Sequence, residues 1–387
     1  MDIRSVPVRV LLVIAGLLTI TFLISGRGIS RSPDILPSSA IHSHRDGYSS
    51  LEDVANQTLG FEKIFVINLP SRTDHRDSMS LAAALTPGGL KLTYVDGVTN
   101  VSAKALPPGG DSPRFDKDMV GLVGAWRAHI NVLRTIVEQN ITSALILEGD
   151  IDWDIRLKAQ MLDFARASRL LVQPGQEDRT FDVHDEPLVK PTTSPYGDID
   201  RWDLLWLGHC GAEFPQSQTG IRQGRVTIFN DETVPQSQHY DREWGSAELI
   251  RAYPNHTRVV HRSRMNVCSL AYGVTQGGAR RFLYELGIRQ LNDAMDIMMR
   301  EMCDGLAGRP MHNCLTVQPQ IFQHHRPVGS KASFSEIQDH GEGYNEVAYT
   351  RNIRWSTRLN FRKLLDGQTD YVDLWQDDMP ANKTAFP

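Results

Sequence analysis

Short apolar runs, separated by segments of helical periodicity, organise the first 150 residues of the chain. The runs at residues 63–69 and 90–95 predict strands, and the run at residues 144–147 is typical of a fully buried strand. A helix is predicted after the first run, and apolar residues at three- and four-residue steps from Val123 to Val137 predict the buried stripe of another. This β-α-β-α-β succession indicates an α/β fold with a mostly parallel, Rossmann-like sheet and flanking helices.

The same alternation continues beyond residue 150 and weakens toward the end of the chain. Strands are predicted at residues 202–207, 269–274 and 315–322, and helices at residues 157–172 and 278–286. A further helix after residue 292 carries Asp296. Residues 173–200 are polar and indicate a surface insertion, and residues 214–264 are turn-rich and irregular. The residues after 333 have no pattern that places them.

An acidic stretch follows the buried strand at residues 144–147. Glu148, Asp150, Asp152 and Asp154 occupy every second position, and alternate side chains of an extended chain point to one face. Ligands of open α/β sheets bind outside the carboxyl ends of strands, which is where these carboxylates would lie. Because crowded carboxylates repel one another, the stretch predicts a divalent cation whose remaining positions accept diphosphate oxygens.

Two other interpretations of the acidic stretch do not involve a cation that binds a diphosphate. The acids can form a solvated strand end that binds nothing. They can also open an EF-hand calcium loop, whose pattern begins D-x-D-x-D. The calcium loop is excluded because its sixth position would be Ile155 instead of glycine and its twelfth Met161 instead of glutamate.

Basic residues follow the first strand, at the start of the predicted helix. Ser71 has the spacing of a helix cap, and Arg72, His75 and Arg76 lie on the first turn. Helix N-termini favour anions, and arginine adds charge-assisted hydrogen bonds to phosphate or carboxylate. The pattern therefore indicates either an anion-binding turn or an ordinary charged helix surface.

Three further positions carry polar groups next to predicted strands or helices. Asp96-Gly97 ends the second strand, where an acid can accept ribose hydroxyls, although Asp-Gly is also a common turn. His129 lies beside the apolar helical stripe, as a packed core histidine would. His324 and His325 follow the late strand, where paired histidines can supply a metal ligand, although surface histidines are common.

The N-terminus carries an apolar run at residues 10–24, flanked by arginines. The run is short for a bilayer, so it indicates either an uncleaved signal anchor or a signal peptide cleaved near residue 25. We expect a cytoplasmic tail at residues 1–9, an anchor helix at 10–26, a luminal stem at 27–60, a folded domain at 61–335 and an extension at 336–387. The location would be the Golgi or ER membrane, as a single-pass type II protein, or outside the cell if the signal is cleaved.

Sequons and composition agree with a globular protein of the secretory lumen. The chain is 41% hydrophobic with a net charge of −5 and no basic run, which argues against nucleic-acid binding. Among the four cysteines we expect a Cys303–Cys314 disulfide or buried free thiols. The motifs of dehydrogenases, P-loop enzymes, zinc proteases and serine hydrolases are absent from the sequence. The candidate N-glycosylation sites are Asn56, Asn100, Asn140, Asn255 and Asn382.

An ordered set of motifs resembles glycosyltransferase family 25, which includes bacterial lipooligosaccharide galactosyltransferases and animal collagen galactosyltransferases. The segments are IFVINLPSRTDHR, YVDG, GLVGAWRAHINVL, LILEGDIDW, LAYGVTQGGARRFL, NDAMDIMM and VQPQIFQHH, and they span residues 61–335. The stem-plus-domain layout resembles fungal members. One position departs from the family's Glu-Asp-Asp pattern, because Gly149 stands where the first aspartate would be.

The resemblance implies a GT-A-like fold that binds a nucleotide sugar with Mn²⁺ and transfers the sugar to a hydroxyl. It assigns the donor to a site that is formed by Asn68, Arg72, Arg76, Asp96, Gly97 and His129. It assigns the metal to Asp150 and Asp152, and we add Asp154 and His324 as further ligand candidates. It also implies that Asp296 activates the acceptor hydroxyl, and we expect Glu148 to act beside it.

The predicted function is metal-dependent transfer of galactose or a similar hexose from a nucleotide sugar, UDP-linked, to a hydroxyl of a glycan or glycoprotein. Gly149 keeps a second interpretation open, in which the fold binds ligands without turnover. A third interpretation is a sugar-nucleotide or glycoside hydrolase, because paired acids also serve that chemistry.

Overall fold

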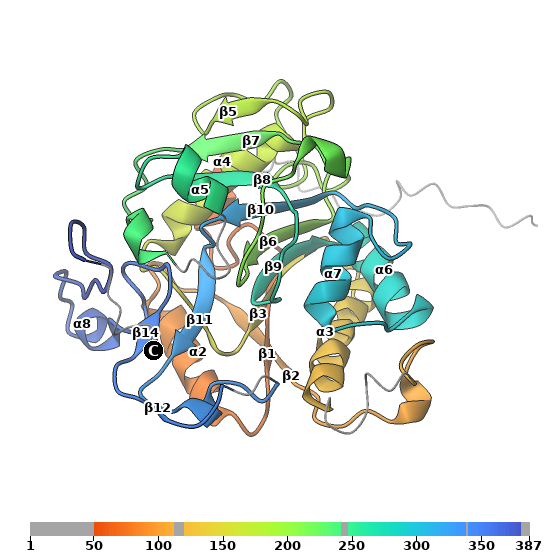
Figure 1. Cartoon of the computed structure of the whole chain (residues 1–387), viewed down its shortest axis with the longest axis horizontal. Coiled ribbons are helices and arrows are strands. Elements are labelled where there is room, and N and C mark those ends of the chain that lie inside the picture. Colours follow the sequence, from red (N-terminus) through yellow and green to blue (C-terminus); the bar gives the residue numbers. More distant parts are fainter. Residues whose placement is uncertain (1–49, 112–119, 241–246, 338–339, 381–387) are drawn as a thin grey trace, which may run out of the picture. The chain divides into compact units, whose positions relative to one another are not determined.

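A mixed sheet forms the centre of the folded part of the chain in the computed structural model of the protein (Figure 1). The structure describes residues 50–111, 120–240, 247–337 and 340–380. The strand order is β2-β1-β3-β9-β6-β10-β8-β7-β5. The strands are β1 (Lys63–Asn68), β2 (Leu92–Asp96), β3 (Ser143–Glu148), β5 (Thr180–Asp182), β6 (Leu204–Gly208), β7 (Arg225–Ile228), β8 (Arg258–Arg262), β9 (Ala271–Thr275) and β10 (Cys314–Gln318).

Strand directions confirm the prediction of a mostly parallel sheet. Strands β8 and β9 each pair antiparallel with both of their neighbours, and the other seven strands of this order point the same way. Asn68 pairs with Asp96, and Ile67 pairs with Glu148. The carboxyl ends of β1, β2 and β3 therefore meet at one edge of the sheet, where ligands of parallel sheets bind.

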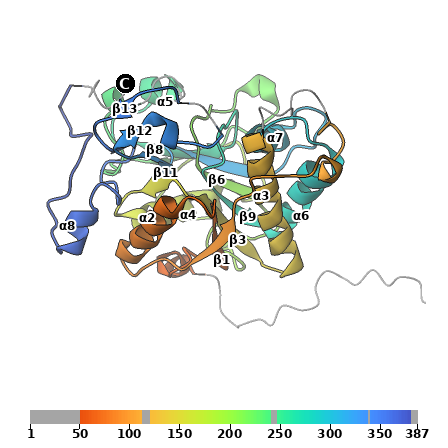
Figure 2. The ribbon, with the colours of Figure 1, turned by 90° about the horizontal axis from the view of Figure 1, so that it is seen from below.

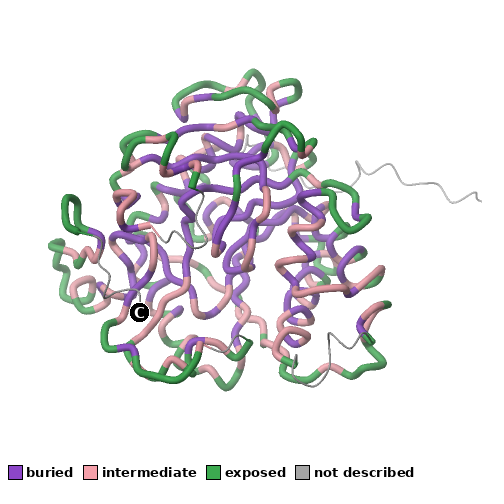
Figure 3. The backbone as a smooth tube through the Cα atoms, viewed as in Figure 1, coloured by how far each residue is buried: buried purple, intermediate pink, exposed green. Residues whose placement is uncertain are grey.

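The central strands are buried on both faces, because their successive residues, which point to opposite faces, are apolar. Ile64, Val66 and Leu145 pack into one core cluster, whereas Phe65 and Ile146 pack into another on the opposite face. In Figure 3 the strands are almost continuously buried, and exposed residues gather in the connecting loops.

Helices cover each face. Helices α2 (Thr73–Leu85) and α4 (Leu157–Leu171) pack on one face, and α3 (Val120–Glu138), α6 (Gln276–Tyr284) and α7 (Met295–Asp304) on the other (Figures 1 and 2). Among the described residues, no helix is both long and apolar enough to cross a membrane. The predicted tail, the anchor and most of the stem lie outside the described residues. The shorter helices are η1 (Leu51–Ala55), η2 (Ala103–Ala105), η5 (Ser217–Thr219), η6 (Ser237–His239), α5 (Ala247–Ala252), η7 (Glu285–Arg289), η8 (Lys331–Ser333) and α8 (Phe361–Leu365).

The C-terminal segment, which the sequence left unplaced, packs against the sheet. Strand β11 (Phe322–Arg326) pairs with β4 (Ile151–Trp153) and with β14 (Tyr349–Thr350). Trp375 is fully buried and donates its indole N–H to the Thr350 carbonyl at 3.0 Å. Two more short strands, β12 (Gly329–Ser330) and β13 (Tyr344–Asn345), form a separate pair. Residues 340–380 therefore help to hold the strands next to the acidic stretch.

Several expected elements differ from the structure. Helix α2 begins at Thr73 and not after a Ser71 cap, and no side chain caps it. The segment 214–264 contains β7, α5 and β8, since short apolar runs among turns still form strands when both faces are covered. The segment 173–200 contains β5, and the late strand 315–322 divides into β10 and β11.

Two disulfides link the four cysteines. The predicted Cys303–Cys314 bond is present. A Cys210–Cys268 bond, which the sequence did not predict, joins residues 58 positions apart. The alternative of free thiols is therefore wrong in this structure.

Candidate functional site

A pocket of about 570 Å³ opens at the carboxyl ends of β1 and β3. Its walls come from the ends of these strands, the first turn of α2, the N-terminal half of α3, residues 268–270, the start of α7, His324 of β11 and residues 335–337. The location is the one predicted for a ligand at the edge of a parallel sheet.

Three side chains in the pocket form a candidate metal site. Ligand atoms of Glu148, Asp150 and His324 all lie within 4.8 Å of one another. The strand ends at Glu148, and a turn at residues 149–150 brings Asp150 back toward β11. The Asp150 Oδ2 to His324 Nε2 distance is 3.6 Å, and an Arg326 guanidinium nitrogen lies 3.7 Å from the same oxygen.

The donor set fits a divalent cation. Burial lowers the pKa of His324 to about 4, so its ring is neutral at pH 7 and keeps a lone pair for a metal. Burial opposes ionisation of Asp150, but the nearby His324 and Arg326 bring its pKa below the ordinary value. Two carboxylates and one imidazole suit Mn²⁺ or another divalent transition metal.

Asp152 and Asp154 do not share this site, which corrects the expectation that the alternating acids line one face. The turn at residues 149–150 ends the extended run, and both side chains instead face the C-terminal segment. Asp152 is fully buried and accepts hydrogen bonds from the Thr350 hydroxyl at 2.8 Å and from the Ser356 hydroxyl. Asp154 accepts the Trp355 N–H at 3.1 Å, and burial raises its pKa to about 7. These two acids fasten the C-terminal segment to β4.

Gly149 is required by close packing against Asn68. A Cβ at position 149 would lie 2.4 Å from Asn68 Oδ1 and 3.3 Å from the Ile67 carbonyl oxygen. Asn68 is held by its amide group, which donates to the carbonyls of Leu69 at 2.8 Å and Arg72 at 3.0 Å. A side chain at position 149 therefore has no space beside Asn68.

Two carboxylates that line the pocket, those of Glu148 and Asp296, are held by residues 268 and 269. Glu148 accepts the Ser269 hydroxyl at 2.7 Å, and its Oε1 lies 3.5 Å from His129 Nε2. Asp296, in the first turn of α7, accepts the Cys268 N–H at 2.7 Å. Burial raises the pKa of Asp296, and the charge of Glu148 acts in the same direction. Such a carboxylate is a stronger proton acceptor than an ordinary aspartate.

The predicted donor-side residues fall into two groups. Asn68, Arg72, Gly97 and His129 line the pocket, and His129 is also buried against Tyr272, whose hydroxyl lies 2.9 Å from Nδ1. The other two, Arg76 and Asp96, are exposed and are not lining residues. Arg76 stacks on the ring of Tyr94, 4.4 Å from its centroid. Their predicted contacts with the nucleotide would require a ligand that reaches beyond the pocket wall.

Arg72 is occupied by two carboxylates. It pairs with Asp74 at 2.7 Å on its own helix and with Glu336 across the pocket. Glu336 is about half exposed, with 46% of its side chain accessible, and Arg72 is mostly buried. An anionic ligand would therefore compete with Glu336 for this guanidinium.

Ser269, Arg358 and Glu336 are site residues that sequence reasoning missed. Arg358 is buried and donates to the Gly149 carbonyl at 2.9 Å, from 209 residues further along the chain. No local pattern could have identified a contact of that separation. Ser269 lies two residues before β9, and a polar residue near a strand boundary was a usable signal.

The described sequon asparagines are all exposed. Asn56, Asn100, Asn140 and Asn255 lie at the surface, whereas Asn382 is outside the described residues. Exposure is necessary for modification, so the four remain candidates.

Comparison with known proteins gives galactosyltransferases as relatives. No family profile matches the chain. Procollagen galactosyltransferase 1 of Danio rerio is 28% identical over 232 residues, which cover 58% of this chain and 33% of that protein. Procollagen galactosyltransferase 1-B of Xenopus laevis is 24% identical over 179 residues, 42% of this chain and 29% of that protein. Procollagen galactosyltransferase 2 of Homo sapiens is 23% identical over 225 residues, 51% of this chain and 36% of that protein.

The chain spans about a third of the length of these relatives, from 29% to 36%. All three are glycosyltransferases by name, so the resemblance drawn from the sequence motifs is confirmed at that level.

Proposed function

We propose that this chain is a glycosyltransferase that transfers galactose, or a similar hexose, from a UDP-linked donor to a hydroxyl of a glycan or glycoprotein. The observation that carries the proposal is the clustering of Glu148, Asp150 and His324 within 4.8 Å in a pocket that also contains Arg72 and Asp296. The similarity to galactosyltransferases supports the same chemistry.

Five residues of the pocket have roles in the proposed reaction. A divalent cation held by Glu148, Asp150 and His324 would supply charge neutralisation for the leaving diphosphate. Arg72, at the start of α2, adds a guanidinium and the positive end of a helix for phosphate oxygens. The pocket walls hold the acceptor oxygen in line with the anomeric carbon, which supplies proximity and orientation.

Asp296 is the proposed proton acceptor for the acceptor hydroxyl. Its raised pKa makes it a better base than an ordinary aspartate, and the Cys268 N–H fixes the direction of one carboxylate oxygen. Glu148 serves as a metal ligand that is oriented by Ser269.

We also propose a luminal location, in the Golgi or ER membrane, with an N-terminal anchor. Two disulfides and four exposed sequon asparagines support an oxidising secretory compartment. Detection of glycans on the expressed chain, and protease protection of intact microsomes, would test this location.

Galactose transfer by the full chain tests the proposed function. UDP-galactose labelled in the sugar is incubated with Mn²⁺ and procollagen, and radioactivity in the protein acceptor is counted, with UDP-glucose and GDP-mannose as donor controls. His324→Ala is expected to lower transfer by about tenfold or more. His325→Ala is the matched control, because this neighbour faces Thr350 and Asp152 instead of the pocket.

The possible results separate transfer from binding alone. Folded protein that binds UDP but transfers no hexose to any acceptor would favour the binding-protein interpretation. Equal loss in the His324→Ala and His325→Ala variants would contradict the assignment of the metal site.

A further inference from the structure

Cys268 has an unusual backbone conformation next to the two pocket carboxylates. Its φ is +66°, a left-handed conformation that costs free energy for any residue with a Cβ. Such conformations persist only where the surrounding structure enforces them, and they gather at functional sites. The contacts around Cys268 must therefore stabilise this conformation.

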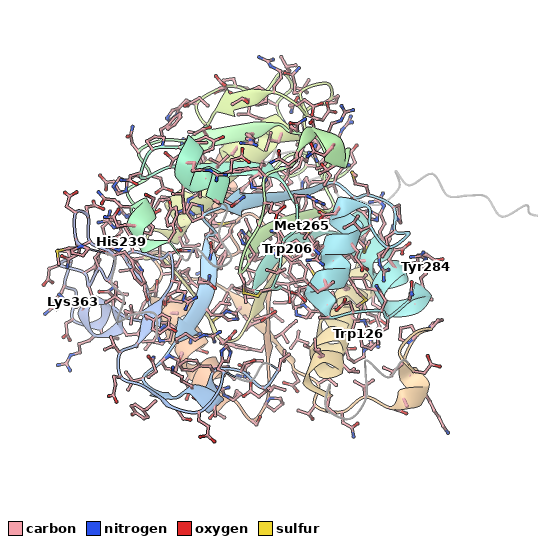
Figure 4. All side chains as sticks on the ribbon, in the orientation of Figure 1. Trp126, Trp206, His239, Met265, Tyr284 and Lys363 are labelled. Atoms are coloured by element: carbon pink, nitrogen blue, oxygen red, sulfur yellow. A yellow bond between two sulfur atoms is a disulfide. The ribbon has the colours of Figure 1, made fainter. Side chains whose placement is uncertain are left out.

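A disulfide and a hydrogen bond hold Cys268 in place, and two further hydrogen bonds hold the residue before it. The Cys268 sulfur is bonded to Cys210, which follows β6. The Cys268 carbonyl accepts the indole N–H of Trp206 on β6 at 2.9 Å. Figure 4 labels Trp206, and also Met265, which lies three residues before Cys268 in the same loop. The residue before Cys268, Val267, also pairs with the segment after β6: the Cys210 N–H donates to the Val267 carbonyl at 2.8 Å, and the Val267 N–H donates to the Gly211 carbonyl at 3.2 Å. The loop is thus fastened to the sheet.

Residues 268–270 in turn hold the two carboxylate residues, Asp296 and Glu148. The Cys268 N–H donates to Asp296 at 2.7 Å, and the Ser269 hydroxyl donates to Glu148 at 2.7 Å. The Glu148 N–H donates to the Leu270 carbonyl at 2.9 Å. Three consecutive residues therefore set the positions of a candidate base and a candidate metal ligand.

We propose that Cys268, through its disulfide to Cys210, is a positioning residue that fixes Asp296 and Glu148 relative to each other for sugar transfer. The disulfide and the Trp206 hydrogen bond hold the backbone at positive φ, and this conformation directs the N–H of residue 268 at Asp296 and the hydroxyl of residue 269 at Glu148. As a role in catalysis, the proposal rests on the proposed glycosyltransferase function.

The second disulfide gives a control. Cys303 and Cys314 are each 2% exposed, whereas Cys210 and Cys268 are partly buried, and the second bond connects the end of α7 to the start of β10. Neither Cys303 nor Cys314 lines the pocket. Its removal costs the chain a cross-link without disturbing residues 268–270.

The experiment compares variants of the full chain that differ in their tolerance of positive φ. Cys210→Ala/Cys268→Gly and Cys210→Ala/Cys268→Val both lack the disulfide, but glycine adopts φ > 0 freely and β-branched valine does not. Cys303→Ala/Cys314→Ala is the control. The measurements are kcat for galactose transfer, the Kd of UDP with Mn²⁺, and amide hydrogen exchange of residues 266–270.

The valine variant is expected to have a kcat about 5- to 30-fold below that of the glycine variant, the ratio that a left-handed conformation costs a residue with a Cβ. Its residues 266–270 should exchange faster, while the Kd of UDP stays within about threefold. The Cys303–Cys314 control should keep the kcat and the exchange rates of the wild type. A general loss of stability would lower the kcat of all three disulfide variants together, and their melting temperatures would record it.

Equal kcat and equal exchange in the glycine and valine variants would overturn the proposal, as would an equal loss in the control. The results also distinguish the proposed function from the proposed positioning role of Cys268. Absence of transfer by the wild type would count against the proposed function, whereas the exchange comparison needs no turnover and still tests the positioning of Cys268.

Discussion

Replacing Gly149 by alanine should damage the site through a single contact. The added Cβ would lie 2.4 Å from Asn68 Oδ1, about 1 Å closer than an ordinary carbon–oxygen contact. Gly149 does not have positive φ, so backbone strain is not the cause. Either the strand end shifts, or Asn68 moves and loses its hydrogen bonds to Leu69 and Arg72.

The expected cost is about 2 kcal/mol of unfolding free energy. Overpacking of a tight interior costs about 1–3 kcal/mol, and the loss of two hydrogen bonds at about 1 kcal/mol each is similar. Asn68 Oδ1 itself has no hydrogen-bond partner among the described residues, so moving that atom loses nothing more. Because Glu148 and Asp150 flank the glycine, Mn²⁺-dependent UDP binding should weaken as well.

A double-mutant cycle measured by urea unfolding tests this explanation. Asn68→Ala removes the obstructing oxygen, so Gly149→Ala in that background should cost less than about 0.5 kcal/mol. Gly277→Ala is the control, because its added Cβ meets nothing closer than 3.4 Å; within helix α6 it should raise stability by up to about 1 kcal/mol and not lower it. Additive costs of Gly149→Ala and Asn68→Ala would refute the contact as the cause.

Three other perturbations have defined outcomes. Glu336→Gln removes a carboxylate that competes for Arg72, so the Kd of UDP should fall about two- to fivefold at low salt, and an unchanged or higher Kd would contradict the competition. Burial lowers the pKa of His261 to about 3, although its ring donates to the Arg262 carbonyl, and the other ring nitrogen accepts from Gln318. Because only the unfolded histidine gains a proton, His261 alone should lower the unfolding free energy by about 1 kcal/mol from pH 6.5 to 5.5. In urea unfolding at both pH values, His261→Gln should reduce that loss, and an unchanged pH dependence would argue against it. Trp375→Ala should lower stability by about 3–5 kcal/mol if residues 340–380 are integral, and a change below about 1 kcal/mol by urea unfolding would contradict that.

Local patterns in the sequence were sufficient for much of the sheet. The apolar runs identified β1, β3, β6 and β9, because strands that are buried on both faces are continuous in hydrophobicity. The edge strand β2, which is only partly buried, was also identified. The same reasoning placed the pocket at the end of β3. Strands β7 and β8 were missed because their short runs lie among turns.

The details of the site depended on tertiary contacts. The prediction assumed that the chain stays extended from Glu148 to Asp154. The turn at residues 149–150 ends the extended run, so Asp152 and Asp154 contact the C-terminal segment instead. His324 was identified as a metal candidate from paired histidines at a strand end. Arg358 reaches Gly149 from the tail, and no periodicity connects such distant residues.

Two aspartates of the acidic stretch allow the most direct test of a metal-dependent donor site. Asp150 lies with Glu148 and His324, whereas Asp152 is hydrogen-bonded to Thr350 and Ser356. Calorimetry would measure the Kd of UDP for the full chain, with Mn²⁺ or with chelator, in wild type, Asp150→Asn and Asp152→Asn. Melting temperatures would confirm that each variant is folded.

We predict that wild-type binding requires Mn²⁺, and that Asp150→Asn weakens it by at least about tenfold. Asp152→Asn should lower the melting temperature while keeping a Mn²⁺-dependent Kd within about threefold of wild type. UDP binding that ignores chelator, or that is lost equally in both variants, would contradict the proposed metal site and the donor chemistry built on it.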